Sequence, residues 1–194
     1  MTGSIRDSIL LSAQVLHRMA DDAVTCGTIA AIVDMSVEAL LRGNKLLLCG
    51  NGGSAADAQH WAGELVSRFN YDRPGLAAIA LTTDSSILTA IGNDYGYDYS
   101  FARQVEAIGR PGDVLFAIST SGRSRNVLAA LEAAKAKGMP TAGFTSETGG
   151  DMLALCDHCL CAPASRTPLV QEAHEVAGHV ICAMIERRIF PRAD

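Results

Sequence analysis

The chain has 194 residues, of which 48% are hydrophobic, and its 16 basic and 21 acidic side chains give a formal net charge of −5. This length suits one domain with a single core. The acidic balance, without a basic run interleaved with aromatic residues, argues against a nucleic-acid surface. The high apolar content favours a homo-oligomer, in which other copies of the chain cover apolar faces.

Signals for export and for disulfide formation are weak in this sequence. We expect no membrane span, and Arg6 and Asp7 precede the first apolar run, unlike a secretory signal. The six cysteines lie in apolar contexts and are predicted to be reduced. The run from Cys156 to Cys161 raises a zinc hypothesis, but the alternation of Cys159 and Cys161 favours a strand without metal. These features predict a cytoplasmic protein that needs no membrane partner.

Helical and strand patterns alternate along the chain. Two N-terminal helices are predicted over about residues 5–24 and 28–41. Strands buried on both faces are predicted at residues 45–50, 77–82, 113–119, 141–145 and 159–162. Helices are predicted at residues 54–69, 85–91, 99–108, 124–137, near 152 and at 168–188. The pattern predicts an α/β fold, a three-layer sandwich around a five-stranded parallel sheet, in one domain spanning residues 1–194.

A glycine-rich turn follows the first predicted strand. Gly50, Gly52 and Gly53 allow positive φ and close approach to a ligand, and the helix that follows offers unpaired N–H groups. Residues just after the strands of a parallel sheet are where ligands bind. The turn therefore predicts an anion-binding or sugar-binding site.

A second ligand-binding turn is predicted after the third strand. Residues 119–124 hold four hydroxyl side chains around Gly122 and lead into a helix, which suits a phosphate. The alternative is a plain helix cap made by Ser121 or Ser124. The spacing fits neither a P-loop nor a dinucleotide fingerprint, which disfavours nucleotide cofactors.

Asparagines and one aspartate also lie beside glycines. Asn51, Asn93 and Asp94 could face a polyhydroxylated ligand or could serve as turn residues, and the sequence leaves both readings open.

Two helices carry clusters of ionisable residues. His60 and Glu64 are four residues apart, so they share a helix face and could act on one ligand or one metal ion. On the last helix Gln171, Glu172, Glu175 and His179 fall within one arc, while His174 lies off it. A solvated ion pair and a solvent-facing stripe are the alternatives.

These motifs together resemble the sugar isomerase (SIS) domain family, and within it the phosphoheptose isomerases. The resemblance covers nearly the whole chain and rests on residues 50–60, Asn93-Asp94, residues 119–122, and Gln171-Glu172 with His179. It implies a flavodoxin-like SIS fold whose N-terminal helices, at about residues 5–41, serve oligomerisation. It also implies a homotetramer with sites between subunits.

The resemblance further implies a role for each motif residue. The sugar contacts are Asn51, Gly52, Gly53, Asn93 and Asp94, and the phosphate contacts are Ser119, Thr120, Ser121 and Ser124. Ser54 and Gln171 are expected to contact the substrate as well. Glu64 and His179 become the acid/base pair, with Glu64 as carbon base and His179 as oxygen acid.

The implied reaction converts sedoheptulose 7-phosphate to a heptose 7-phosphate aldose through an enediol, at the start of ADP- or GDP-heptose precursor synthesis. The implied cofactor is one zinc ion per subunit, held by His60, Glu64, Gln171 and His179. Gln171 and His179 are about 12 Å apart along the helix, so both reach one ion only by leaning towards each other. Two non-enzymatic alternatives share the fold, namely an adaptor that binds the replication initiator DnaA and a sugar-phosphate sensor. The presence of both Glu64 and His179 favours the enzyme.

Overall fold

Five parallel strands form the centre of the molecule. The computed structural model describes residues 2–192, so residues 1, 193 and 194 of the predicted domain lie outside it. The strands are β1 (Leu46–Gly50), β2 (Ala78–Ala80), β3 (Val114–Ile118), β4 (Thr141–Ser146) and β5 (His158–Ala162). Their order is β2-β1-β3-β4-β5, and every pairing is parallel. Gly50 pairs with Ile118, so the turns that follow β1 and β3 lie side by side at the switch point of the sheet.

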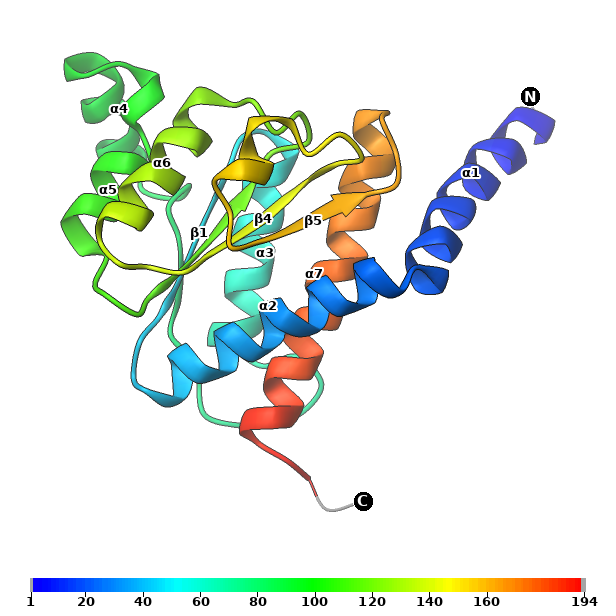
Figure 1. Cartoon of the computed structure of the whole chain (residues 1–194), viewed down its shortest axis with the longest axis horizontal. Helices are drawn as coiled ribbons and strands as arrows, with labels where there is room; N and C mark the ends of the chain where they lie inside the picture. The colour runs from blue at the N-terminus through cyan, green and yellow to red at the C-terminus, as the bar shows by residue number, and fades with distance from the viewer. Residues whose placement is uncertain (1, 193–194) are drawn as a thin grey trace.

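Helices cover both faces of this sheet, which confirms the predicted α/β sandwich (Figure 1). One face packs against α2 (Ala23–Leu41), α3 (Gly53–Val66) and α7 (Thr167–Ile189). The other packs against α5 (Ala102–Ile108), α6 (Arg125–Ala136) and the 3-10 turn η2 (Gly150–Ala154). Helix α4 (Ser85–Asp94) and the 3-10 turn η1 (Tyr97–Tyr99) lie at the end of the second layer, and α4 has no buried residue.

Burial on both faces, predicted for all five strands, holds only for the central ones. Every residue of β1, β3 and β4 is buried. The prediction is wrong for the edge strands, because Ile79 in β2 is 43% exposed and β5 is only partly buried. An edge strand lacks a neighbour on one side, and this leaves its outer surface less covered.

The two N-terminal helices are present, but they are divided earlier than predicted. Helix α1 (Thr2–Asp21) ends before Asp22, whose carboxylate accepts hydrogen bonds from the backbone N–H groups of Val24 and Thr25 and so caps α2. Helix α1 extends away from the sheet (Figure 1) and exposes Ile5 and Ile9.

Helix α2 corrects the expectation that nothing in the chain could span a membrane. Its 19 residues have a mean hydropathy of 1.6, which meets the length and composition of a membrane span. A core helix of a soluble protein meets the same test. Ile32, Val33 and Val37 of α2 belong to the hydrophobic core, so packing within the fold accounts for part of its apolar character.

A buried ion pair ties the segment after α3 to α7. Arg73 and Glu186 have side chains that are 2% and 0% exposed, and Nε of Arg73 lies 3.0 Å from Oε1 of Glu186. The same carboxylate accepts hydrogen bonds from the backbone N–H groups of Phe69 and Asn70. Arg73 also donates to the carbonyl oxygens of Glu64 and Leu65 at the end of α3. The pair therefore fixes α3 relative to α7.

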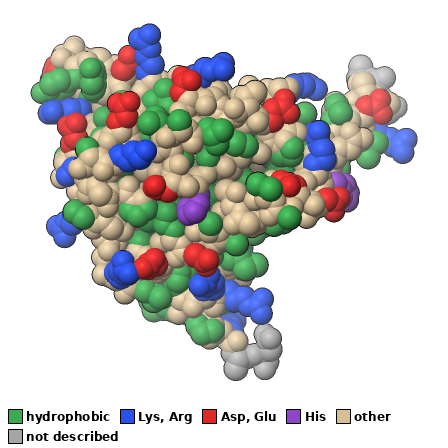
Figure 2. Space-filling view, viewed as in Figure 1, with side chains coloured by type: hydrophobic (Ala, Val, Ile, Leu, Met, Phe, Trp, Pro, Cys, Tyr) green, Lys and Arg blue, Asp and Glu red, His purple; other side chains and the backbone are tan. Residues whose placement is uncertain are grey.

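The surface carries mixed charge. Acidic and basic side chains are interspersed with hydrophobic ones over the face shown in Figure 2. This distribution matches the modest net charge of −5 and gives that face no broad region of one sign.

Candidate active site

The turn after β1 has the glycine geometry that the sequence predicts. Gly52 is the N-cap of α3 and has a φ of +57°. A Cβ at Gly50 would lie 2.6 Å from the carbonyl oxygen of Ser54, and one at Gly53 would overlap the amide of Gln171 on α7. Glycine at these positions lets the backbone turn sharply and lets Gln171 approach it.

Three serine hydroxyls gather in the turn after β3. Oγ of Ser119 lies 3.0 Å from Oγ of Ser124 and 3.4 Å from Oγ of Ser121. Ser124 occupies the N-cap position of α6, but its side chain makes no capping hydrogen bond. The hydroxyl of Ser124 therefore faces Ser119 and the first amides of α6 are left without a side-chain cap, as an anion site requires.

A pocket of about 300 Å³ joins the two turns. Its lining residues come from the β1 and β3 turns and from the start of α7: Asn51, Gly52, Gly53, Ser54, Ile118, Ser119, Thr120, Ser124, Thr167 and Gln171. Eight of the eleven residues that the sequence analysis assigned to the substrate are in this group. Ser121 is not a lining residue, although its Oγ lies 3.4 Å from that of Ser119.

Asn93 and Asp94 are not brought to this pocket. They are exposed at the end of α4, and Nδ2 of Asn93 donates to Oδ1 of Asp94 over 2.7 Å. Asp94 lines a separate groove between α4 and α5, together with Tyr95 and Arg103. In the described part of the chain, Asn93 and Asp94 therefore lie outside the pocket between the two turns.

Asn51 is held by two partners that no motif in the sequence predicts, Asn126 and Tyr97. Its amide pairs with that of Asn126, at 2.8 and 2.9 Å, and its Oδ1 also accepts a hydrogen bond from the hydroxyl of Tyr97. Asn126 is buried and donates in addition to Ser100. No local motif marks Asn126 or Tyr97, because their role depends on the pairing of β1 with β3.

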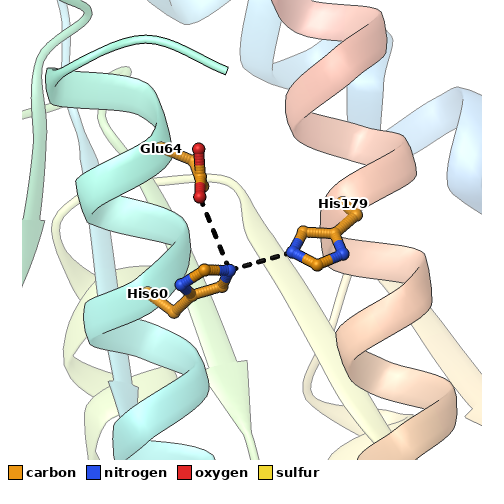
Figure 3. A group of neighbouring side chains, drawn as sticks. All are labelled: His60, Glu64 and His179. Carbon is orange, nitrogen blue, oxygen red and sulfur yellow. Dashed lines mark hydrogen bonds and ion pairs between the residues drawn. The ribbon is translucent and has the colours of Figure 1, made fainter. Parts of the chain in front are cut away.

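A cluster of ionisable side chains lies between α3 and α7 (Figure 3). His60 and Glu64 project from α3 towards His179 on α7, and their ligand atoms lie within 4.8 Å of one another. Nε2 of His60 is 2.9 Å from Nε2 of His179 and 3.6 Å from Oε1 of Glu64. The structure therefore brings together three of the four predicted metal ligands, whereas Gln171 lies against Gly53 in the pocket.

Two further carboxylates lie close to this cluster. Oε1 of Glu175 is 3.1 Å from Nε2 of His60 and 3.2 Å from Nε2 of His179. The pKa of Asp57 is raised to about 6, mainly by burial and also by the charge of Glu175, while the charge of His60 opposes the rise. Helical periodicity predicts Glu175 on the polar arc of α7 but predicts no role for it. Its position four residues from both Gln171 and His179 was the available signal.

The residues present fit a divalent metal ion. Imidazole nitrogen with carboxylate oxygen is a donor set that zinc accepts. Two Nε2 atoms only 2.9 Å apart can share one proton at most, and their lone pairs converge on one position. A cation at that position would accept the lone pairs of both nitrogens at once. The triad can therefore hold a metal ion.

His174 lies off the polar arc, as predicted. It is fully buried beneath the sheet, and its Nε2 lies 3.0 Å from the carbonyl oxygen of Thr145. Burial lowers the pKa of His174 to about 4. This histidine is therefore a neutral part of the core.

Known proteins resemble this chain over nearly its whole length. The sequence profile of the SIS domain family matches residues 12–146. The phosphoheptose isomerase of Burkholderia pseudomallei is 54% identical over 186 residues, which cover 96% of this chain and 94% of that protein. The phosphoheptose isomerase of Aneurinibacillus thermoaerophilus is 52% identical over 190 residues, which cover 98% of this chain and 96% of that protein. The structure of phosphoheptose isomerase from Neisseria gonorrhoeae matches with a TM-score of 0.89 at 40% identity, covering 95% of this chain and 98% of that one.

Proposed function

Because the chain belongs to the phosphoheptose isomerase family of SIS domain proteins and is thus an isomerase of aldoses and ketoses, we propose that it converts sedoheptulose 7-phosphate to D-glycero-D-manno-heptose 7-phosphate. The product would supply ADP- or GDP-heptose for lipopolysaccharide or capsule, in the cytoplasm. One observation carries the proposal: a hydroxyl-lined pocket and an acid/base cluster lie along the same two helices, α3 and α7.

The substrate spans these two features. Its phosphate binds the hydroxyls of Ser119, Thr120, Ser121 and Ser124, and Asn51, Gly52, Gly53, Ser54 and Gln171 contact the sugar. Asn93 and Asp94 complete the set from the neighbouring subunit or after movement of α4. From Gly53 to His60 helix α3 advances about 10 Å. A seven-carbon chain can cover this span, so the phosphate and the reacting carbons reach separate ends of the groove.

Two proton-transfer groups perform the isomerisation. Glu64 takes a proton from C1 of the ketose and returns it to C2, which passes through an enediol. His179 donates a proton to the oxygen on C2 and accepts one from the oxygen on C1. The facing of Glu64 and His179 across α3 and α7 supports this division of roles. Each group contributes about 10²- to 10⁴-fold to the rate.

The ion is proposed to be zinc, held by His60 and His179, with Glu64 and Gln171 as the other ligands that the family resemblance implies. When bound, it would polarise the substrate carbonyl as a Lewis acid. Complete removal of metal with a chelator should abolish turnover, and added zinc should restore it. Full activity of the metal-free protein would contradict a catalytic ion.

The functional assay follows aldose formation from sedoheptulose 7-phosphate. Glu64→Gln and His179→Gln should each lower kcat by about 10²-fold or more. Glu132→Gln, on the exposed face of α6, is the matched control and should retain the wild-type rate. Unchanged turnover in both site variants would refute the assigned roles.

We also propose that the protein is a homotetramer with its sites at subunit interfaces. An apolar groove of about 310 Å³ lies between α2 and α7, lined by Ile29, Val33, Val180 and Met184 among others. Exposed apolar side chains on α1 add to this surface. Light scattering should give four times the monomer mass of 20.4 kDa. A monomer at working concentration would contradict the assembly.

A further inference from the structure

The cysteines at the start of β5 have no part in the proposed active site. Cys156 precedes the strand and Cys159 and Cys161 lie on it, which gives the pattern Cys-x-x-Cys-x-Cys. All three are free thiols and half-buried, so a small solute can reach them. Within residues 2–192 the only ligand atoms close enough together to hold a metal ion are those of the cluster between α3 and α7, so these thiols are not a metal site. The other common chemistry of paired thiols is disulfide formation.

A gap above Gly143 brings two of the sulfurs together. Gly143 on β4 pairs with Cys159 on β5. A Cβ at Gly143 would lie 2.5 Å from Sγ of Cys156 and 3.0 Å from Sγ of Cys159, so both sulfurs occupy space that a side chain would fill. The buried Met152 closes the same gap, with its Cε 3.3 Å from that Cβ position. The absence of a side chain at Gly143 therefore makes Cys156 and Cys159 neighbours.

Cys161 is the less suitable partner for Cys159. Alternate residues of an extended strand have Cα atoms about 6.6 Å apart, at the upper end of the range of about 4.4–6.8 Å that disulfides allow. Sγ of Cys161 instead approaches the carbonyl oxygen of Cys159, at 3.9 Å. Cys156 lies outside the strand, so the strand spacing does not limit it.

The turn between Cys156 and Cys159 is anchored to β4. Oδ2 of Asp157 accepts hydrogen bonds from the backbone N–H and the hydroxyl of Thr141, over 2.8 and 2.9 Å. The backbone N–H of Asp157 donates in return to Oγ1 of Thr141 over 3.0 Å. An anchored turn holds the two thiols at close range, which favours a reaction between them over reactions with separate molecules.

We propose that Cys156 and Cys159 form a reversible disulfide by exchange with glutathione disulfide or a similar small disulfide. The thiolate of Cys156 attacks one sulfur of that oxidant, which gives a mixed disulfide and releases one glutathione thiolate. The thiolate of Cys159 then attacks Sγ of Cys156, forms the internal bond and releases the second glutathione. Each cysteine gives its proton to a released glutathione, so two cysteines are oxidised while one glutathione disulfide is reduced to two thiols.

The order of the two attacks follows from the surroundings of Cys159. Its pKa is raised to about 12, first by the thiol of Cys156 and also by burial, while Cys161 opposes the rise. Cys159 therefore keeps its proton at neutral pH, and Cys156 reacts first. Once Cys156 is in the mixed disulfide it can carry no charge, which removes the main cause of the raised pKa of Cys159.

The 3-10 turn η2 connects this thiol pair to the phosphate turn after β3. The backbone N–H of Cys156 donates to the carbonyl oxygen of Met152 over 3.1 Å. The backbone N–H groups of Asp151 and Met152 donate in turn to the carbonyl oxygen of Gly122, over 3.0 and 3.1 Å. A disulfide holds its sulfurs about 2.0 Å apart, so closing the bond displaces Cys156 and with it η2. The effect on phosphate binding rests on the proposed function, whereas the bond itself does not.

Peptide mapping tests the bond without any substrate. The reduced protein is equilibrated with glutathione disulfide, alkylated and digested with trypsin, which releases residues 138–166 with all three cysteines. The wild-type peptide should lose two hydrogen atoms and be alkylated only at Cys161. Cys161→Ser is the matched control and should form the same bond, whereas Cys156→Ser and Cys159→Ser should form none. Circular dichroism verifies that each variant is folded.

Three results would overturn the bond: three free thiols in the oxidised wild-type peptide, glutathione attached without an internal bond, or a bond between Cys159 and Cys161.

Hydrogen exchange and kinetics test the effect on the phosphate turn. On oxidation, the amides of Asp151 and Met152 should exchange at least about twofold faster, because their hydrogen bonds to Gly122 are disturbed. KM for sedoheptulose 7-phosphate should rise about threefold or more with little change in kcat, and dithiothreitol should reverse both changes. Cys159→Ser treated alike should show neither. Unchanged exchange in the oxidised wild type would refute the link through η2, whereas a reduced protein without isomerase activity would count against the proposed function alone.

Discussion

The buried Arg73–Glu186 pair should be among the most sensitive sites for stability. Glu186→Gln preserves side-chain size but leaves Arg73 as a charge without its partner, in a place where both side chains are almost fully buried. Breaking a buried pair in this way costs about 3–5 kcal/mol of unfolding free energy. For a chain of this length each kcal/mol lowers Tm by about 2–4 °C, so the variant should melt roughly 6–20 °C lower.

Urea unfolding and calorimetry of Glu186→Gln measure this loss directly. The matched control is Glu38→Gln, because Glu38 forms an ion pair with Arg42 in which the two side chains are 60% and 70% exposed. That pair should contribute less than about 1 kcal/mol. If Glu186→Gln costs no more than Glu38→Gln, the reasoning from burial is refuted.

Acidification gives a second check on the same pair. Burial alone would raise the pKa of Glu186, but hydrogen bonds from Asn70, Phe69 and Arg73 hold it below the ordinary value of 4.5. The stability that Glu186 contributes is therefore fully present above pH 4.5 and is lost as the pH falls through the lowered pKa. The stability difference between the wild-type protein and Glu186→Gln should shrink over that range.

Three further outcomes are expected. The lowered pKa of His174, about 4, means that stability declines as the pH falls from about 6.5 towards 4, and His174→Gln should flatten that decline in urea unfolding. In steady-state kinetics, Ser119→Ala and Ser124→Ala should each raise KM about tenfold or more with little change in kcat. Each substitution removes a hydrogen bond to the charged phosphate of the substrate. Gly178→Ala should lower the free energy of unfolding by about 1–3 kcal/mol, because the added methyl group overlaps Trp61. Gly63→Ala adds its methyl group in open space on α3 and should raise the free energy of unfolding by about 0.4–1 kcal/mol in the same assay.

The sequence predicted the fold well where one physical signal dominated. The apolar runs located all five strands, because central strands of a parallel sheet must be apolar on both faces. It overestimated burial at Ile79, since nothing local distinguishes an edge strand from a central one. It divided the N-terminal helices too late, because the cap at Asp22 interrupts a helical pattern that is otherwise continuous.

The candidate site was predictable in its motifs but not in its geometry. The two turns were predicted separately, and they meet because β1 and β3 are neighbours in the sheet. The contacts of Asn126 with Asn51 and of Glu175 with His60 depend on how separate elements pack, and no short pattern encodes that packing. Helical periodicity put Glu175 on the correct face, and only the structure gave it neighbours.

The two imidazoles of the cluster are 119 residues apart in the chain, and this separation orders events during synthesis. A ribosome adding 5–20 residues per second needs about 6–24 s to pass from one histidine to the other. During most of that interval His60 can be present on a formed α3, whereas the synthesis of α7, which begins at Thr167, has not started. Capture of the proposed metal ion would therefore be one of the last steps in the maturation of this protein, and a nascent chain stalled before α7 should bind no ion at this cluster.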